Sequence, residues 1–367
     1  MKIYNNLNIS KNHKNSVIAI GNFDGIHSGH QKVIAQAKKK AKKNRLPFGL
    51  ITFEPMPVMF FNSKIKNYRI NSLLQKKIQL EKFRLDFLII IKFNKLFSLL
   101  SAEQFIKRFI YSKIKSKYIF VSKNFKFGRK RKGNINTLKK FENIFRFKTI
   151  ITPPLRNSKR IISSSLIRKK ISLGKIEEAN KLLSRPWCVK GKVIKGKRRG
   201  RKIGFPTCNI KLNDYMLPKL GVYSVIVKTN YFKRKGIANI GYRPTFNGQN
   251  LLLEVNIFGI NKNLYNKEII VNFVRFITSQ TAKIVVTGFR HFFAPTSSPH
   301  LSSTAQSISK NPDIKNKKNR PRSSCNINWG LKTFRHLIFA NSAPVFCMDW
   351  NCVMPISKVA RRRKVQR

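Results

Sequence analysis

The sequence predicts an α/β domain with a mainly parallel sheet, followed by a small antiparallel β-barrel. Over residues 1–184, apolar β-branched runs alternate with helical stretches, which is the pattern of strands joined by crossover helices. Over residues 185–277, short β-type runs are separated by Gly, Pro and Asn instead. Residues 278–367 start with a polar stretch containing Ser and Pro, continue into an apolar stretch without a helical or strand period, and end in a basic run, which predicts an atypical, disordered extension.

The first part contains strands and helices in alternation. The predicted helix 31–43 places Val33, Ile34 and Ala37 on one side and lysines on the other. A parallel sheet with helices on both faces binds ligands at the carboxyl ends of its strands, where Asp24 and Asn124 fall. The predicted strands are 16–23, 48–55, 86–93 and 117–125, and the predicted helices are 31–43, 72–84 and 101–113.

The second part begins close to Leu183–Pro186, where the helical pattern stops. Its runs have the length and spacing of strands in a small barrel or sandwich. The predicted strands are 221–228, 235–242, 251–258 and 267–276.

The chain is strongly basic, with 77 Lys and Arg, 13 Asp and Glu, and a formal net charge of +64. Such a field attracts polyanions, so nucleic-acid binding is one interpretation. The other is compositional bias, because Lys, Asn, Ile and Phe are all frequent and the lysines are spread through every segment. We favour the bias and expect only non-specific polyanion binding, with no specific nucleic-acid partner.

The sequence predicts a cytoplasmic protein that does not bind membranes. No stretch approaches the roughly 20 apolar residues that cross a bilayer, and the N-terminus lacks a signal-peptide pattern. The five cysteines show neither a disulfide framework nor a CxxC pair, which fits a reducing compartment.

The stretch "GNFDGIHSGH", residues 21–30, lies between a predicted strand and a predicted helix. Unpaired backbone N–H groups gather at such a turn and bind phosphates. His27 and His30 can point to one side of the helix, and Gly29 leaves room for a nucleotide to approach the backbone. The pattern favours nucleotidyl transfer, which needs fixed donors for developing charge. The alternative is a glycine-rich turn with a capping histidine.

The second part has fewer candidate residues. Glu254 is a charge inside an apolar strand, which is costly without a partner or a purpose, although it could also face the surface. The Thr207 hydroxyl and the Asn209 amide are oxygen ligands suited to Mg²⁺, unless they only satisfy a turn.

Several motifs resemble those of the bacterial bifunctional riboflavin kinase/FAD synthetase family. "GNFDGIHSGH" matches its G-x-F-D-G-x-H-x-G-H stretch, and "GRKIGFPTCN", 200–209, matches its GRxLGFPTAN. Six further stretches match, in the family's order along the chain: "TFEPMP", "VSKNFKFG", "ISSSLIR", "GVYSV", "NIGYRPTFNG" and "LEVNIF", which contains Glu254. The chain departs at Met56, Ser122, Ser165 and Cys208, and it lacks the family's closing helix after residue 277.

The resemblance implies a Rossmann-like HxGH nucleotidyltransferase domain and a riboflavin kinase barrel. It implies that His27 and His30 contact ATP phosphates and that Glu254 takes the proton from the ribityl hydroxyl. Ser163 and Ser164 also form an N-cap cluster by pattern alone, with or without a ligand. The remaining implied residues are Gly21, Asp24, Gly29, Asn124, Ser163, Ser164 and Arg168 for ATP in the first site, Gly204 and Arg243 for ATP or flavin in the second, and Thr207 and Asn209 for Mg²⁺.

We therefore expect a bifunctional enzyme. One half phosphorylates riboflavin to FMN with MgATP, and the other adenylylates FMN to FAD and releases pyrophosphate. Two alternatives stay open. Only the adenylyltransferase survives the altered C-terminal end, or the chain is a non-catalytic basic protein that binds RNA.

Overall fold

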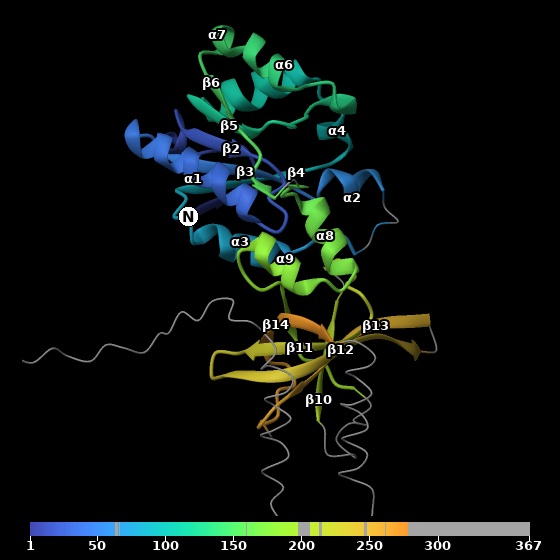
Figure 1. Ribbon diagram of the computed structural model, residues 1–367. Coiled ribbons are helices and arrows are strands. Elements are labelled where there is room, and N and C mark those ends of the chain that lie inside the picture. The colour runs from blue at the N-terminus through green and yellow to red at the C-terminus, as the bar shows by residue number, and fades with distance from the viewer. Residues whose placement is uncertain are drawn as a thin grey trace, which may run out of the picture. The chain divides into compact units, whose positions relative to one another are not determined.

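The computed structural model describes residues 1–62, 65, 67–158, 160–196, 206–212, 215–245, 248–260 and 262–277, with the backbone alone for 243–245 and 248–250. Its first sheet has six strands in the order β1-β4-β3-β2-β5-β6, and every neighbouring pair is parallel (Figure 1). The predicted parallel sheet is confirmed. The strands are β1 Lys2–Tyr4, β2 Val17–Ile20, β3 Phe48–Glu54, β4 Phe87–Lys92, β5 Tyr118–Ser122 and β6 Lys148–Thr152.

Helices cover both faces of this sheet. Along β2, Val17 and Ala19 pack into one apolar core, while Ile18 and Ile20 pack into another. The first core includes α1 and α3, and the second includes η2 and α6. The helices are α1 Ser28–Lys43, α2 Pro57–Phe61, α3 Leu73–Glu81, α4 Lys95–Ser98, α5 Ala102–Phe105, the π-helix η2 Ile106–Ile114, α6 Ile135–Lys140, α7 Glu142–Phe145, α8 Ser164–Ser172 and α9 Ile176–Leu183, and single 3₁₀ turns span Lys11–His13 and Arg129–Arg131.

Local capping explains where the predicted helices begin. Helix α1 starts three residues before the predicted 31, because the His27 side chain caps it. Ser72 and Gln75 form a capping box that starts α3, and Ser101 and Gln104 form another at α5. The predicted helix 101–113 was wrong in its detail. It is a short α-helix that widens into a π-helix, in which the Ser112 hydroxyl donates to the Lys107 carbonyl.

Among the described residues, no helix combines the length and the apolar character needed to span a bilayer.

The second sheet is antiparallel throughout, in the order β10-β13-β12-β11-β14-β9. A bridge between Ile194 and Asn209 links its two ends, so the sheet approaches a closed barrel. The four predicted strands are confirmed, and β9 and β10 are additional. The strands are β9 Cys188–Lys192, β10 Thr207–Lys211, β11 Gly221–Lys228, β12 Lys233–Thr245, β13 Gly248–Ile257 and β14 Glu268–Ile277, and a hairpin of β7 Arg156–Asn157 and β8 Arg160–Ile161 precedes α8.

Helices α8 and α9 pack against the antiparallel sheet. Ile171 of α8 and Leu182 of α9 share one apolar core with Val225 and Phe273 of the barrel strands. The parallel-sheet part ends with α9 at Leu183, and β9 starts at Cys188. The boundary predicted between residues 184 and 185 falls in this short connection and stays a prediction. The predicted extension 278–367 lies outside the described residues.

Candidate functional site

The first candidate site is the turn between β2 and α1. Its backbone is strained, because φ is positive at Phe23 (46°), Gly25 (81°) and Ile26 (40°). Side chains other than glycine rarely adopt such angles, so surrounding contacts must hold the turn.

Side-chain donors from several elements hold the carbonyl groups of this turn. Because a trans peptide directs N–H and C=O in opposite directions, the amides joined to these carbonyls point away from the donors. The N–H groups of Gly25 and His27 have no hydrogen-bond partner within the described part of the chain. The bonds are Lys76 Nζ to Asn22 O (3.0 Å), Thr52 Oγ1 to Asn22 O (3.1 Å), Ser164 Oγ to Asp24 O (2.8 Å), Arg185 Nη2 to Gly25 O (2.6 Å) and Gln31 Nε2 to Ile26 O (3.0 Å).

The two histidines lie against each other at the start of α1. Their rings stack with centroids 3.7 Å apart, and His27 Nδ1 accepts the His30 amide at 3.3 Å. Burial, followed by the charges of Arg185 and Arg168, lowers the pKa of His27 to about 4. Burial, followed by His27 and Lys76, holds the pKa of His30 well below its ordinary value. Both imidazoles are therefore neutral at pH 7, and the proton of His27 sits on Nε2.

The buried Asp24 of the turn forms an ion pair with the partly buried Arg168 of α8. Arg168 Nη1 lies 2.6 Å from Asp24 Oδ2, and the Ile70 amide donates to Asp24 Oδ1 at 3.0 Å. Burial raises the pKa of Asp24, and the charges of Arg168 and Lys76 oppose this shift. Arg168 also donates to the Tyr68 hydroxyl at 2.7 Å and stacks over its ring. The pair fixes both side chains.

The other predicted residues of the first site lie on neighbouring elements. Ser163 caps α8 by accepting the Leu166 amide, as the serine cluster predicts. Asn124 is exposed just after β5, the strand next to β2. Gly21 follows β2, and Gly29 lies in the first turn of α1, where a Cβ would stand 3.1 Å from the His27 ring.

Sequence reasoning missed Lys76 and Arg185. Lys76 is 2% exposed, and burial lowers its pKa while Asp24 and Glu54 raise it. Its position was a usable signal, because Lys76 follows Leu73 and precedes Leu80 at the spacing of one helix face. Arg185 gives no such signal, since its partner Gly25 lies 160 residues away.

An aromatic cluster lies at the same carboxyl edge of the sheet. The rings of Phe60, Phe61 and Phe93 contact one another with centroids 5.2 to 5.7 Å apart. Phe61 is 69% exposed and Leu96 is 78% exposed. Large exposed apolar side chains gathered beside a polar site mark a surface that a flat, apolar group can cover.

The second candidate site lies on one face of β10 and β13. Asn209 stands directly opposite Glu254 in the register, and Thr207 stands opposite Asn256. Opposite residues of antiparallel strands project to the same face, with Cβ atoms about 5 Å apart. The structure therefore brings Thr207, Asn209 and Glu254 together. Asn239 of β12, which the sequence reasoning did not select, is opposite Glu254 on its other side.

Asn209 is the most buried polar group of this face. It is 5% exposed, and its Oδ1 has no hydrogen-bond partner among the described residues. Gly196 leaves room for its amide, because a Cβ there would lie 2.2 Å from Asn209 Nδ2. Gly204 lies outside the described residues, and Arg243 lies in β12 in register with Asn250.

Where the structure describes the chain, no three His, Cys, Asp or Glu side chains gather as a metal-binding group. A site built from Thr and Asn oxygens is of a different kind, typical of Mg²⁺ held together with substrate phosphates.

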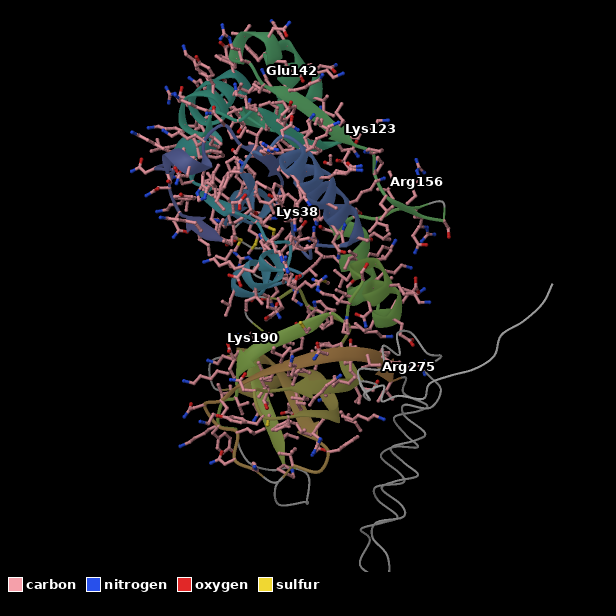
Figure 2. The ribbon with its side chains drawn as sticks, turned by 90° about the vertical axis from the view of Figure 1, so that its left-hand side faces the viewer. Lys38, Lys123, Glu142, Arg156, Lys190 and Arg275 are labelled. Carbon is pink, nitrogen blue, oxygen red and sulfur yellow. The ribbon has the colours of Figure 1, made fainter. Side chains whose placement is uncertain are left out.

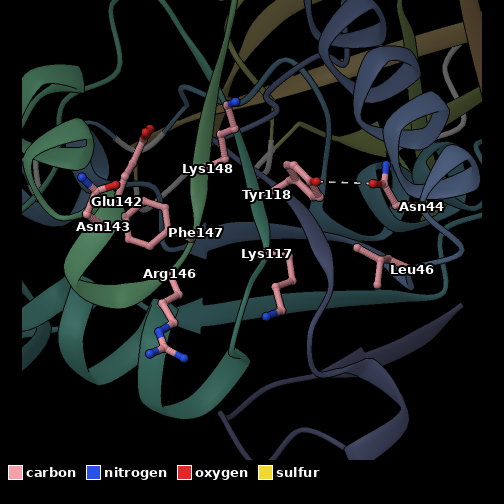
Figure 3. Close-up of a pocket in the computed structure, with 9 residues that line it drawn as sticks. All are labelled: Asn44, Leu46, Lys117, Tyr118, Glu142, Asn143, Arg146, Phe147 and Lys148. Carbon is pink, nitrogen blue, oxygen red and sulfur yellow. Dashed lines mark hydrogen bonds between the residues drawn. The ribbon is translucent and has the colours of Figure 1, made fainter.

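A separate surface pocket opens at the amino ends of β5 and β6, where Tyr118 donates to Asn44 at 3.3 Å (Figure 3). These are the opposite strand ends from the histidine turn, and the lining contains none of the predicted site residues. The lining residues are Asn44, Leu46, Lys117, Tyr118, Glu142, Asn143, Arg146, Phe147 and Lys148.

Basic side chains are spread over both halves of the described chain (Figure 2). Lys38 lies on α1, Arg156 on β7 and Lys190 on β9. Compositional bias predicts such a spread, whereas a nucleic-acid site concentrates basic residues on one face. The expectation of non-specific polyanion binding, without a specific nucleic-acid partner, stays a prediction.

Comparison with known proteins gives consistent matches over both halves. A family described as FAD synthetase matches residues 9–166, and one described as riboflavin kinase matches residues 183–282. A relative from Buchnera aphidicola subsp. Schizaphis graminum, named bifunctional riboflavin kinase/FMN adenylyltransferase, is 42% identical over 71% of this chain and 85% of its own length. A relative of that name from Listeria monocytogenes is 36% identical over 71% of this chain and 84% of its own.

A solved structure also shares the fold. It is titled as a macrolide-efflux protein from Streptococcus pneumoniae and is 32% identical, with a TM-score of 0.66. The match covers 78% of this chain and 95% of that one.

Proposed function

The chain belongs to the bifunctional riboflavin kinase/FMN adenylyltransferase family, and we propose that its two activities occupy the two sites described above. It phosphorylates riboflavin to FMN, and it transfers AMP from ATP to FMN, which yields FAD and pyrophosphate. We assign residues 1–184 to adenylyl transfer and residues 185–277 to the kinase reaction. Family membership favours this enzyme over the RNA-binding alternative and over a chain with one activity.

The assignment of adenylyl transfer to the first site rests on the turn Asn22–Ile26, whose carbonyl groups accept hydrogen bonds from side chains of other elements. In adenylyl transfer, an FMN phosphate oxygen attacks the α-phosphorus of ATP, and the bond to the leaving pyrophosphate breaks. Negative charge develops on the phosphoryl oxygens, and donors fixed in advance stabilise it. The unpaired Gly25 and His27 amides and the His27 Nε2–H supply such donors.

The roles of the other first-site residues follow from their contacts. Asp24 positions the turn, because its carboxylate already accepts from Ile70 and Arg168. Arg168 places its charge beside the histidines. Asn124, exposed after β5, contacts the nucleotide from the neighbouring strand.

We assign the aromatic cluster of Phe60, Phe61 and Phe93 to the flavin ring of FMN. An isoalloxazine ring is flat and largely apolar, so it gains from stacking on exposed aromatic faces. The cluster follows β3 and β4, at the edge where the histidine turn follows β2.

The second site fits a magnesium ion. The orphaned Asn209 Oδ1 is a buried oxygen that needs a partner, and Thr207 and Glu254 share its face. When bound, Mg²⁺ offsets the charge of the ATP phosphates. Glu254 accepts the proton of the ribityl 5′-hydroxyl, whose oxygen attacks the γ-phosphorus as ADP leaves. Thr207 and Asn209 would hold the ion through their side-chain oxygens.

We place the reaction in the reducing cytoplasm. Cys188 and Cys208 are free thiols, as that compartment keeps them.

Two variants test the division of labour. His27→Ala should abolish conversion of FMN to FAD and leave phosphorylation of riboflavin intact, and Glu254→Gln should do the reverse. Matched controls are His13→Ala, which changes a histidine bonded to Tyr4, and Glu268→Gln, which changes a glutamate of β14. Flavins are separated by chromatography after incubation with MgATP. If either variant keeps the activity assigned to its residue, that assignment is wrong.

A further inference from the structure

Arg185 connects the first site to the segment that opens the kinase half. Its Nη2 donates to Gly25 O at 2.6 Å and to Asn71 Oδ1 at 3.0 Å, and its Nη1 donates to Leu183 O at 3.1 Å. The guanidinium is planar and rigid, so three acceptors fix it in one orientation. The Arg185 side chain therefore connects the strained turn to Asn71, which precedes the N-cap of α3, and to Leu183 at the end of α9.

The position of Arg185 depends on the barrel. Two residues later, Trp187 is 1% exposed and packs against Phe273 of β14 with the rings tilted by 37° and their centroids 4.6 Å apart. Asn180 accepts the Trp187 amide at 2.6 Å and donates to the Phe273 carbonyl at 2.9 Å. The barrel core thus holds the Arg185–Trp187 segment.

The same segment reaches the first site by a second route. Trp187 Nε1 donates to Ile70 O at 2.9 Å, and the Ile70 amide donates to Asp24 Oδ1 at 3.0 Å. At the end of α9, Leu182 O accepts Ser28 Oγ and Leu183 O accepts Gln31 Nε2, both from the first turn of α1. The turn and the helix that carry the histidines are therefore bonded to the segment around Arg185.

We propose that Arg185 is a positioning residue for adenylyl transfer. Through it, the segment that opens the kinase half holds the Gly25 peptide of the histidine turn in its reactive conformation. The proposal rests on the assignment of that turn to adenylyl transfer. It makes the first site incomplete without residues 183–187, although the family model for FAD synthesis matches only residues 9–166.

The hydrogen bond from Arg185 to Gly25 O matters because the turn that it restrains is strained. Residues with positive φ on both sides of Asp24 relax when a restraining contact is lost. Gly25 O belongs to the Gly25–Ile26 peptide, which lies between the Gly25 and His27 amides. Its relaxation therefore moves both amides away from the phosphoryl oxygens, while the surfaces that bind FMN stay in place. A displacement of about 1 Å costs roughly 100-fold in rate.

The test measures both activities in the full chain for Arg185→Ala, Arg185→Lys and the control Arg108→Ala, whose arginine is exposed on η2. In Arg185→Ala we expect kcat for FMN adenylylation to fall roughly 10- to 100-fold, with KM for FMN and riboflavin kinase activity unchanged. Arg185→Lys keeps the charge and a single donor nitrogen in place of the planar guanidinium, so it should recover part of the loss. Arg108→Ala should behave as the wild type.

Three results overturn the proposal: unchanged adenylylation in Arg185→Ala, an equal fall of both activities, or a loss confined to KM. If Arg185→Ala does not fold by circular dichroism, Trp187→Phe keeps an aromatic ring in the barrel core and removes the indole N–H that donates to Ile70 O. It should lower adenylylation alone, and full adenylylation in that variant would also overturn the proposal. A wild-type chain unable to convert FMN would instead refute the assignment of the turn itself.

Discussion

Acidification should destabilise the first half through His27. The residue is 5% exposed, and burial, then Arg185 and Arg168, lower its pKa from 6.5 to about 4. In the unfolded chain the imidazole titrates near 6.5, so the unfolded state binds more protons between these two values. Stability contributed by neutral His27 is therefore present at pH 7 and is lost as the pH falls from 6.5 towards 4.

The linkage relation gives the size of this effect. For one group with pKa values of 6.5 unfolded and about 4 folded, moving from pH 7 to pH 5 costs about 2 kcal/mol of unfolding free energy. His30 acts in the same direction, because its pKa is also held well below the ordinary value.

Urea unfolding at pH 7 and pH 5, followed by circular dichroism, compares the wild type with His27→Asn. Asparagine keeps an oxygen that can cap α1 by accepting the His30 amide, and it does not titrate. The variant should therefore lose about 2 kcal/mol less than the wild type over this interval. Equal losses in the two proteins would refute the reasoning, because His27 would then titrate alike in the folded and unfolded chains.

Three further substitutions test other parts of the account. Gly29→Ala places a Cβ 3.1 Å from the His27 ring, so the rate of adenylylation should fall. The thermal unfolding midpoint should stay unchanged, because Ala favours a helix over Gly by up to ~1 kcal/mol, and full adenylylation activity would contradict the expectation. Asp24→Asn removes the carboxylate that accepts from Arg168 and the Ile70 amide, and urea unfolding should reveal a loss of roughly 1–3 kcal/mol; an unchanged midpoint would exclude a stabilising pair. Phe61→Ala removes an exposed ring from the aromatic cluster and should raise KM for FMN up to roughly tenfold in adenylylation alone; an unchanged KM would place the flavin elsewhere.

Much of the fold could be predicted from local pattern. The four predicted strands of the first sheet are runs whose residues are buried on both faces, so their apolar character is continuous. The edge strands β1 and β6 were missed, because the first has three residues and the second, "KTIIT", begins with an exposed lysine. The π-helix could not be predicted, since apolar spacing does not distinguish it from an α-helix.

The candidate sites also contain residues that the sequence could predict and residues that it could not. The histidine pair and the capping serines are neighbours in sequence, so a motif reveals them. The donors that hold the turn come from Thr52, Lys76, Ser164 and Arg185, and only the folded chain brings them to Asn22–Ile26. Glu254 could be selected as a costly charge, but its position opposite Asn209 depends on the register of β10 and β13.

A single assay of both conversions decides whether the two sites are active. The purified full chain is incubated with riboflavin, Mg²⁺ and ATP, and separately with FMN, Mg²⁺ and ATP, and the flavins are resolved by chromatography. We expect FAD from both mixtures, with FMN as an intermediate in the first. FAD from FMN alone would contradict an active kinase site, and no conversion in either mixture would contradict both assignments.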